Sequence, residues 1–128
     1  MDRSDMRSPL ARAQGLGSAK RGASHWWAQR VSAVALAPLT VWFLGSVIAH
    51  TGGDYATVIN WLKTPLATLA MIVLLIALFH HMALGLQVVI EDYVHSNAKF
   101  AAVIAVRLGC FALASAGLVA TLRLGFSR

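Results

Sequence analysis

The sequence predicts an all-α membrane protein with three transmembrane helices, and three observations support this fold class. Hydrophobic residues make up 58% of the 128 residues and charged residues only 12%, whereas soluble domains carry about 25% charged residues. Three apolar runs are each long enough for a bilayer core, which a helix of about 20 residues crosses. None of them alternates polar and apolar residues like the strands of a membrane barrel. A soluble enzyme and a disordered chain are therefore close to excluded.

The three apolar runs are almost free of charge. Residues 31–53 and residues 64–90 contain no Asp, Glu, Lys or Arg, and residues 100–122 contain only Arg107. Arg107 is expected to snorkel to the lipid headgroups or to pair with a partner subunit, and the sequence does not decide between these roles. We expect the following three helices: roughly 31–50, 66–91 and 100–122.

The basic residues predict the orientation of the chain. Residues 1–24 form a basic N-terminal segment ahead of a transmembrane domain over 25–128, and six of the eleven Lys and Arg precede the first apolar run. Cytoplasmic segments are enriched in Lys and Arg, so the N-terminus and residues 92–99 are predicted to be cytoplasmic. Asp2 and Asp5 argue against a mitochondrial transit peptide, which favours a bacterial inner membrane. The same asymmetry explains the net charge of +6 without a nucleic-acid partner.

The second apolar run carries the residues that indicate chemistry. His80 and His81 lie well inside an otherwise uncharged span, where an ionisable side chain is costly and usually functional. A neutral imidazole can bind haem iron. At about 100° per residue, His81, Gly85 and Asp92 share one helix face, while His80 lies on another. The residues alone support two interpretations equally well: a haem ligand, and a buried histidine that only hydrogen-bonds a neighbouring backbone carbonyl or serine. A proton or ion pathway is a third alternative.

The residues from His81 to Tyr93 resemble a motif of the hydrophobic membrane-anchor subunit of succinate dehydrogenase, the smaller of the two anchor types in respiratory complex II. The motif combines a histidine, a glycine four residues later, and an Asp-Tyr pair seven residues after the glycine. The segment HWWAQRVSA at residues 25–33 is similar to the family's approach to its first helix. The resemblance covers about residues 17–122 and agrees with the chain length, the three spans and the basic N-terminus.

The resemblance implies roles for individual residues. A second anchor subunit would complete the helix bundle, and the two anchors would hold one haem b between them. His81 takes the position of an axial ligand of the haem iron, because it has the family's spacing to Gly85. Tyr93 matches the tyrosine that hydrogen-bonds a quinone, and Asp92 matches its acidic neighbour at the quinone site. Arg30 matches an arginine close to the haem propionates; His80 would then only pack or form hydrogen bonds.

The function implied by the resemblance is that of a subunit of succinate:quinone oxidoreductase, in the tricarboxylic acid cycle and the respiratory chain. No residue of this chain would be catalytic in succinate oxidation. The implied partners are a flavoprotein subunit, an iron–sulfur subunit, a second cytochrome b anchor subunit and membrane lipid, with ubiquinone or another quinone as substrate. A fumarate reductase anchor is the nearest alternative, because fumarate reductase catalyses the same reaction in the reverse direction. A small proton-coupled homo-oligomeric transporter is less favoured, because the other two helices offer no matching intramembrane acid.

Overall fold

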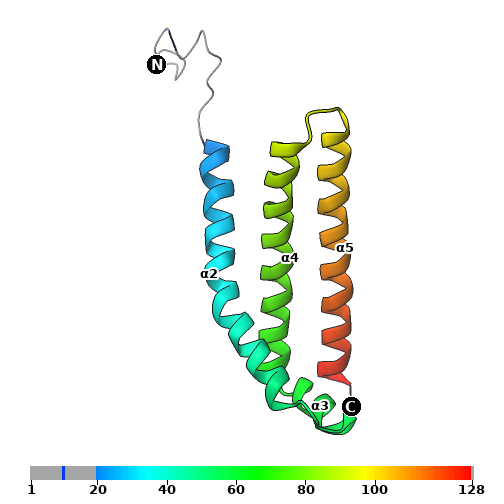
Figure 1. The fold of residues 1–128 in the computed structure, drawn as a ribbon. Helices are drawn as coiled ribbons and strands as arrows, with labels where there is room; N and C mark the ends of the chain where they lie inside the picture. The colour runs from blue at the N-terminus through cyan, green and yellow to red at the C-terminus, as the bar shows by residue number, and fades with distance from the viewer. Residues whose placement is uncertain (1–9, 11–19, 128) are drawn as a thin grey trace, which may run out of the picture.

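The computed structural model describes residue 10 and residues 20–127. These residues form one short helix and three long ones: α2 (Lys20–Ala49), α3 (Tyr55–Leu62), α4 (Pro65–Tyr93) and α5 (Ala98–Phe126). Figure 1 shows the long helices side by side, with α4 between α2 and α5. Within the described part of the chain, α4 packs against both neighbours, whereas no close backbone contact joins α2 to α5. The predicted all-α fold class is confirmed.

All three long helices are long and apolar enough to cross a membrane, so the prediction of three spans is confirmed. The chain is a multi-pass membrane protein. Only 11% of the most apolar stretch of α2, and 6% of those of α4 and α5, is buried inside the chain. Most residues of these stretches therefore keep part of their apolar surface exposed to lipid or to another subunit.

The helices extend further than the apolar runs predicted. α2 begins at Lys20 instead of near residue 31, and α5 continues to Phe126 instead of ending near residue 122. Lys, Arg and Gln are good helix formers, and the early part of α2 contains all three, so this helix continues beyond its apolar stretch. Residues 1–9 and 11–19 of the predicted N-terminal segment lie outside the described residues, and the domain boundary at residue 24 stays a prediction.

The connection between α2 and α4 contains a short helix, α3, that the sequence pattern did not predict. Gly52 has a φ of +88°, a conformation that glycine adopts without the steric cost of a Cβ. Asp54 then caps α3 by accepting a hydrogen bond of 2.9 Å from the backbone N–H of Thr57. Hydrogen bonding by the side chain of Thr57, and then by its backbone N–H, holds the pKa of the Asp54 carboxyl below its usual value.

Aromatic side chains attach α3 to the end of α2. The ring of Trp61 lies 4.7 Å from the ring of His50 and 6.0 Å from that of Trp42. The Nδ1 atom of His50 is also 2.7 Å from the carbonyl oxygen of Ser46. Figure 1 shows that α2 bends toward α3 in the part of the helix that contains Pro38. Proline has no N–H for the helix ladder, which is a common cause of such bends.

α4 begins at a proline and packs closely against α5 near its start. The Thr64 side chain caps the helix and Pro65 occupies its first turn, where the missing N–H of proline has no intrahelical partner to lose. A Cβ at Gly125 of α5 would stand 2.7 Å from Cγ2 and 2.8 Å from Oγ1 of Thr68. The two helices therefore approach this closely only because residue 125 has no side chain.

Candidate functional site

His81 is joined to α2 by a hydrogen bond to a buried hydroxyl. Its Nδ1 atom lies 3.0 Å from Oγ of Ser32. That Oγ also donates to the carbonyl oxygen of Gln29, one turn earlier in α2, at 3.0 Å. Ser32 is only 7% exposed, and Thr68 is the one other polar side chain counted as buried among the described residues. The hydrogen bond orients the His81 ring toward α2.

Gly85 lies on the face of α4 that carries His81, as the helical spacing predicted. The atom nearest to a Cβ built at Gly85 is Nε2 of Gln29, at 3.8 Å, which is an ordinary van der Waals distance. Val88, on the same face, lines a groove together with His25 of α2. Within the described part of the chain, no contact between α2 and α4 requires a glycine at position 85.

His80 has a different environment from its neighbour. Its exposed side chain lines the groove between α2 and α4 as well as the groove between α4 and α5. Most of the residues that line these two grooves are apolar, and His80 forms no hydrogen bond with a described residue. The two histidines are therefore not equivalent, and only His81 is fixed by another helix.

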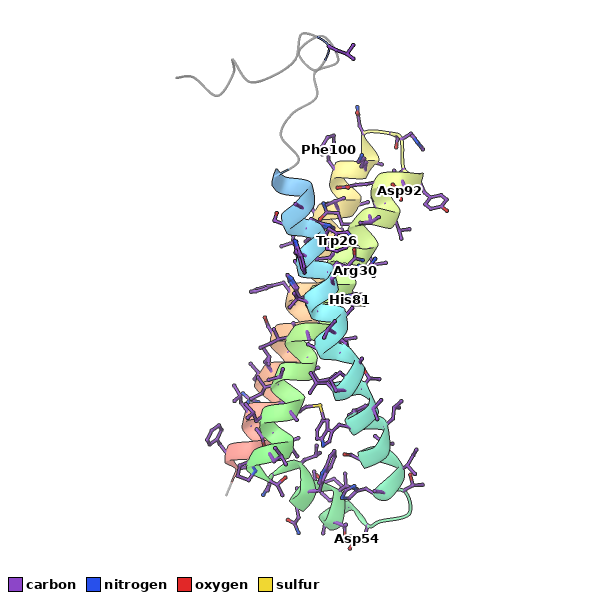
Figure 2. The ribbon with its side chains drawn as sticks, turned by 90° about the vertical axis from the view of Figure 1, so that its left-hand side faces the viewer. Trp26, Arg30, Asp54, His81, Asp92 and Phe100 are labelled. Atoms are coloured by element: carbon purple, nitrogen blue, oxygen red, sulfur yellow. The ribbon has the colours of Figure 1, made fainter. Side chains whose placement is uncertain are left out.

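Arg30 lies two residues before Ser32 and so projects from a different face of α2. Its guanidinium carbon is 5.3 Å from the centroid of the Trp26 ring, which is a cation–π distance. The ring of Trp26 in turn contacts the ring of Trp27 edge-on, with the centroids 5.1 Å apart. Figure 2 shows Trp26 and Arg30 on α2 near the level of His81. The exposed Arg30 side chain forms no ion pair with a described residue.

Asp92 and Tyr93 lie in the last turn of α4, which ends at Tyr93. Both side chains are exposed, and Tyr93 is 80% exposed. Figure 2 shows Asp92 near the end of α4, on the same level as Phe100 and well separated from His81. At about 1.5 Å per residue, the separation along the helix axis is about 16 Å. The candidate site therefore has two parts, one at the middle of the helices and one at their end.

A polar network between α4 and α5 was not predicted from the sequence. Arg107 donates hydrogen bonds from Nε and Nη2 to Oε1 of Gln87, at 3.2 and 2.7 Å. Gln87 in turn donates from Nε2 to Oε1 of Glu91, at 2.7 Å. Arg107 therefore has a partner inside its own chain, which we did not predict. Its snorkelling or pairing with a partner subunit stays a prediction. The sequence did contain a signal: Arg107 is the single charged residue of the third apolar run, and Gln87 and Glu91 lie four residues apart at the end of the second.

His25 lies beside this network and has an unsatisfied ring atom. It lines one groove with Gln87, Glu91 and Arg107. Its Nε2 atom is buried and has no hydrogen-bond partner among the described residues. A buried polar nitrogen without a partner costs free energy, so a polar group from outside the described chain would be stabilised here.

Comparison with known proteins identifies the family. The family described as succinate dehydrogenase/fumarate reductase transmembrane subunit matches residues 4–114. The chain belongs to this family. The matched region extends into α5 and contains the four residues with predicted roles: Arg30, His81, Asp92 and Tyr93. The resemblance to succinate dehydrogenase anchor subunits is confirmed.

Several relatives are similar over most of their length. The succinate dehydrogenase hydrophobic membrane anchor subunit of Rickettsia bellii (strain RML369-C) is 36% identical over 105 residues, which cover 81% of this chain and 84% of the relative. The subunit of the same name from Paracoccus denitrificans is 32% identical over 118 residues, covering 92% of each chain. The succinate dehydrogenase membrane anchor subunit of Reclinomonas americana is 33% identical over 81 residues, covering 61% of this chain and 68% of the relative. No solved structure gives a significant match.

Proposed function

We propose that this family member is the hydrophobic anchor subunit of a succinate:quinone oxidoreductase, and that His81 is one axial ligand of a haem b. The observation that carries the proposal is the family match over residues 4–114, which includes the motif from His81 to Tyr93. The hydrogen bond between His81 Nδ1 and Ser32 is compatible with it. It leaves Nε2 as the ring atom available to a metal, and a ligating histidine commonly has its other ring nitrogen engaged in this way. When bound, the haem supplies a reversible one-electron centre inside the membrane.

Other residues of the chain fit a haem beside His81. Gly85 lies one turn away and is not needed for the packing of α2 on α4, so its small size can accommodate a flat macrocycle. Arg30 is a cation without an ion-pair partner among the described residues, and the haem propionates are anions. The buried Nε2 of His25 lacks a partner and could donate a hydrogen bond to the same carboxylates. The second axial histidine would come from the second anchor subunit.

Tyr93 and Asp92 are proposed to form this chain's part of the quinone site. Reduction of ubiquinone, or of another quinone, requires two electrons and two protons. A phenol that donates a hydrogen bond to a quinone carbonyl stabilises negative charge there as electrons arrive. A carboxylate at the aqueous boundary can relay protons to the same place. The high exposure of Tyr93 agrees with a pocket that other subunits complete.

The partners and orientation follow from the same proposal. The electrons would come from succinate through a flavoprotein subunit and an iron–sulfur subunit, and a second cytochrome b anchor would cover the open faces of the helices. The N-terminus would be cytoplasmic in a bacterial inner membrane, because the basic residues precede α2. The quinone site would then lie at the cytoplasmic boundary. The relatives described above are named succinate dehydrogenase subunits, which favours succinate oxidation over fumarate reduction as the reaction of the complex.

The proposal is tested by replacing each of the two histidines in the assembled complex. His81→Ala should abolish the b-type band in the reduced-minus-oxidised spectrum, because iron loses one axial ligand. His80→Ala is the matched control, since His80 is the adjacent imidazole without a hydrogen bond to another helix. It should retain the band. Co-purification of the partner subunits shows whether each variant assembles, and loss of the band in His80→Ala alone would contradict the assignment.

A further inference from the structure

We propose that Ser32 is a positioning residue, which fixes the tautomer of His81 so that its Nε2 lone pair is presented to the haem iron. This inference rests on the proposed haem ligation by His81 and adds a function for a residue on another helix. The juxtaposition that supports it brings together three groups: the His81 ring, the Ser32 hydroxyl and the Gln29 carbonyl.

The proton inventory of these three groups determines the tautomer. A serine hydroxyl has one proton to donate and can accept through its lone pairs. The Gln29 carbonyl oxygen, 3.0 Å from Oγ, can only accept, so both contacts of Oγ are hydrogen bonds only when Ser32 donates its proton to that oxygen. Oγ can then only accept from His81, so the Nδ1 atom at 3.0 Å carries the ring proton. Neutral imidazole has one N–H, which leaves Nε2 deprotonated and able to bind iron.

The burial of Ser32 makes this arrangement stable. The side chain is 7% exposed, so water has little access to compete for its oxygen. Reversing the tautomer would make Ser32 donate to Nδ1 instead and would withdraw its bond from the Gln29 carbonyl. It would also place a proton on Nε2, where the iron has to bind. The hydrogen bonds of α2 therefore favour the ligating form of His81 before any haem arrives.

The same hydrogen bond should affect the electronic properties of the bound haem. A ligating imidazole that donates its second N–H to an acceptor is a more basic ligand. A more basic ligand donates more electron density and stabilises ferric iron, which lowers the midpoint potential. Removing the acceptor should raise the potential, and it should weaken haem retention by about tenfold or more, as the loss of outer-shell partners does at other metal sites.

The experiment compares Ser32→Ala, Ser32→Thr and Ser32→Cys in the purified complex, with redox titration of the b-type band and haem content per complex. Ser32→Ala should raise the midpoint potential and lower the haem content. Ser32→Thr keeps the hydroxyl, so its midpoint potential and its haem content should both equal the native values. Ser32→Cys has nearly the native size but a weak acceptor, so its potential should lie between those of the Ala and native forms.

The control is Thr121→Val on α5. The Thr121 hydroxyl donates to the Gly117 carbonyl in the same helix, at 2.8 Å, as Ser32 donates to Gln29. It forms no hydrogen bond with a histidine among the described residues. Its removal should leave the potential unchanged.

The outcomes separate the two proposals. If His81→Ala retains the haem, the proposed ligation is wrong. If His81→Ala loses the haem but Ser32→Ala and Ser32→Cys keep the native potential and haem content, the role of Ser32 is wrong. If Ser32→Ala fails to assemble, the potential of Ser32→Cys decides, because an unchanged value overturns the proposal and a raised value supports it.

Discussion

At the scale of single residues, the two tyrosines of the chain offer a controlled comparison. Tyr93 is 80% exposed at the end of α4, and Tyr55 is 81% exposed at the start of α3. α3 and the end of α4 lie at opposite ends of the long helices (Figure 1). The two phenol groups have the same chemistry and nearly the same exposure, so a difference in their effects on activity would come from what binds beside them.

Tyr93→Phe should lower quinone reduction by the complex about tenfold, which corresponds to the loss of one hydrogen bond of about 1.4 kcal/mol. Succinate oxidation measured with an artificial dye should stay at the native rate, because the electrons leave before the quinone site. Tyr55→Phe should leave both activities unchanged. An equal loss of both activities in Tyr93→Phe would indicate failed assembly instead of a damaged quinone site.

The sequence predicted the helix face of the site but not its partners on other helices. The 3.6-residue period is a local property of α4, so it correctly placed Gly85 on the face of His81. The hydrogen bond between His81 and Ser32 depends on how α2 is rotated against α4, and no local pattern contains that rotation. The bond from Arg107 to Gln87 was missed for the same reason. The roles of Arg30, Asp92 and Tyr93 stay predictions, because the groups proposed to contact them belong to other molecules.

At the scale of the elements, the close approach of α4 and α5 depends on Gly125. A methyl group there would meet both branches of Thr68, at 2.7 and 2.8 Å, so rotating the Thr68 side chain would not relieve the clash. Thr68 is itself held by a hydrogen bond of 3.0 Å to the Leu62 carbonyl. The two helices would have to move apart to accept any larger residue.

Gly125→Ala should therefore destabilise the protein by about 1–3 kcal/mol, the usual cost of overpacking, less about 0.5–1 kcal/mol gained in helix propensity. Thermal unfolding of the complex in detergent, followed by circular dichroism, measures the difference. Gly109→Ala is the matched control on the same helix, because among the described residues its new Cβ would meet no atom within 4 Å apart from its own stretch of helix. Equal stabilities of the two variants would contradict the proposed close packing.

Element types were predicted more accurately than element ends. Apolar runs of membrane length identified the three spans, because burial of the backbone in lipid requires helix. The lengths of the helices outside the apolar runs were underestimated. α2 begins at Lys20, among polar residues that a search for apolar runs does not include. The helix α3 was missed because its eight residues are too few to show a period. Its attachment also depends on contacts of Trp61 with Trp42 of α2 and with His50, just after α2.

At the scale of the whole molecule, α4 lies between the two other long helices, α2 and α5, and much of the apolar surface has no partner within the described part of the chain. The most apolar stretches of the helices are at most 11% buried, and α2 and α5 do not close on each other within the described part of the chain. Transmembrane helices associate through close packing and hydrogen bonds, and this chain satisfies few of these interactions internally. A second membrane subunit is the proposed complement.

Purification of the tagged chain in a mild detergent should recover a flavoprotein, an iron–sulfur protein and a second membrane subunit, together with a b-type spectrum. Mass spectrometry of the eluted proteins and a reduced-minus-oxidised spectrum provide the measurement. Recovery of a haem-free homo-oligomer without these partners would contradict the proposed function and would favour the transporter alternative.

The central position of α4 also has a consequence for biosynthesis. During synthesis α2 emerges first, α4 second and α5 last, so each new helix can pack on the helix made just before it. The order of translation thus matches the order of contacts, and the chain needs no rearrangement among its own helices in the lipid. Without partner subunits, the apolar faces of its helices would stay uncovered, and membrane proteases would degrade such an unassembled chain. We expect copies made in excess of their partners to be degraded quickly, so that the rarer subunit sets the amount of complex in the cell.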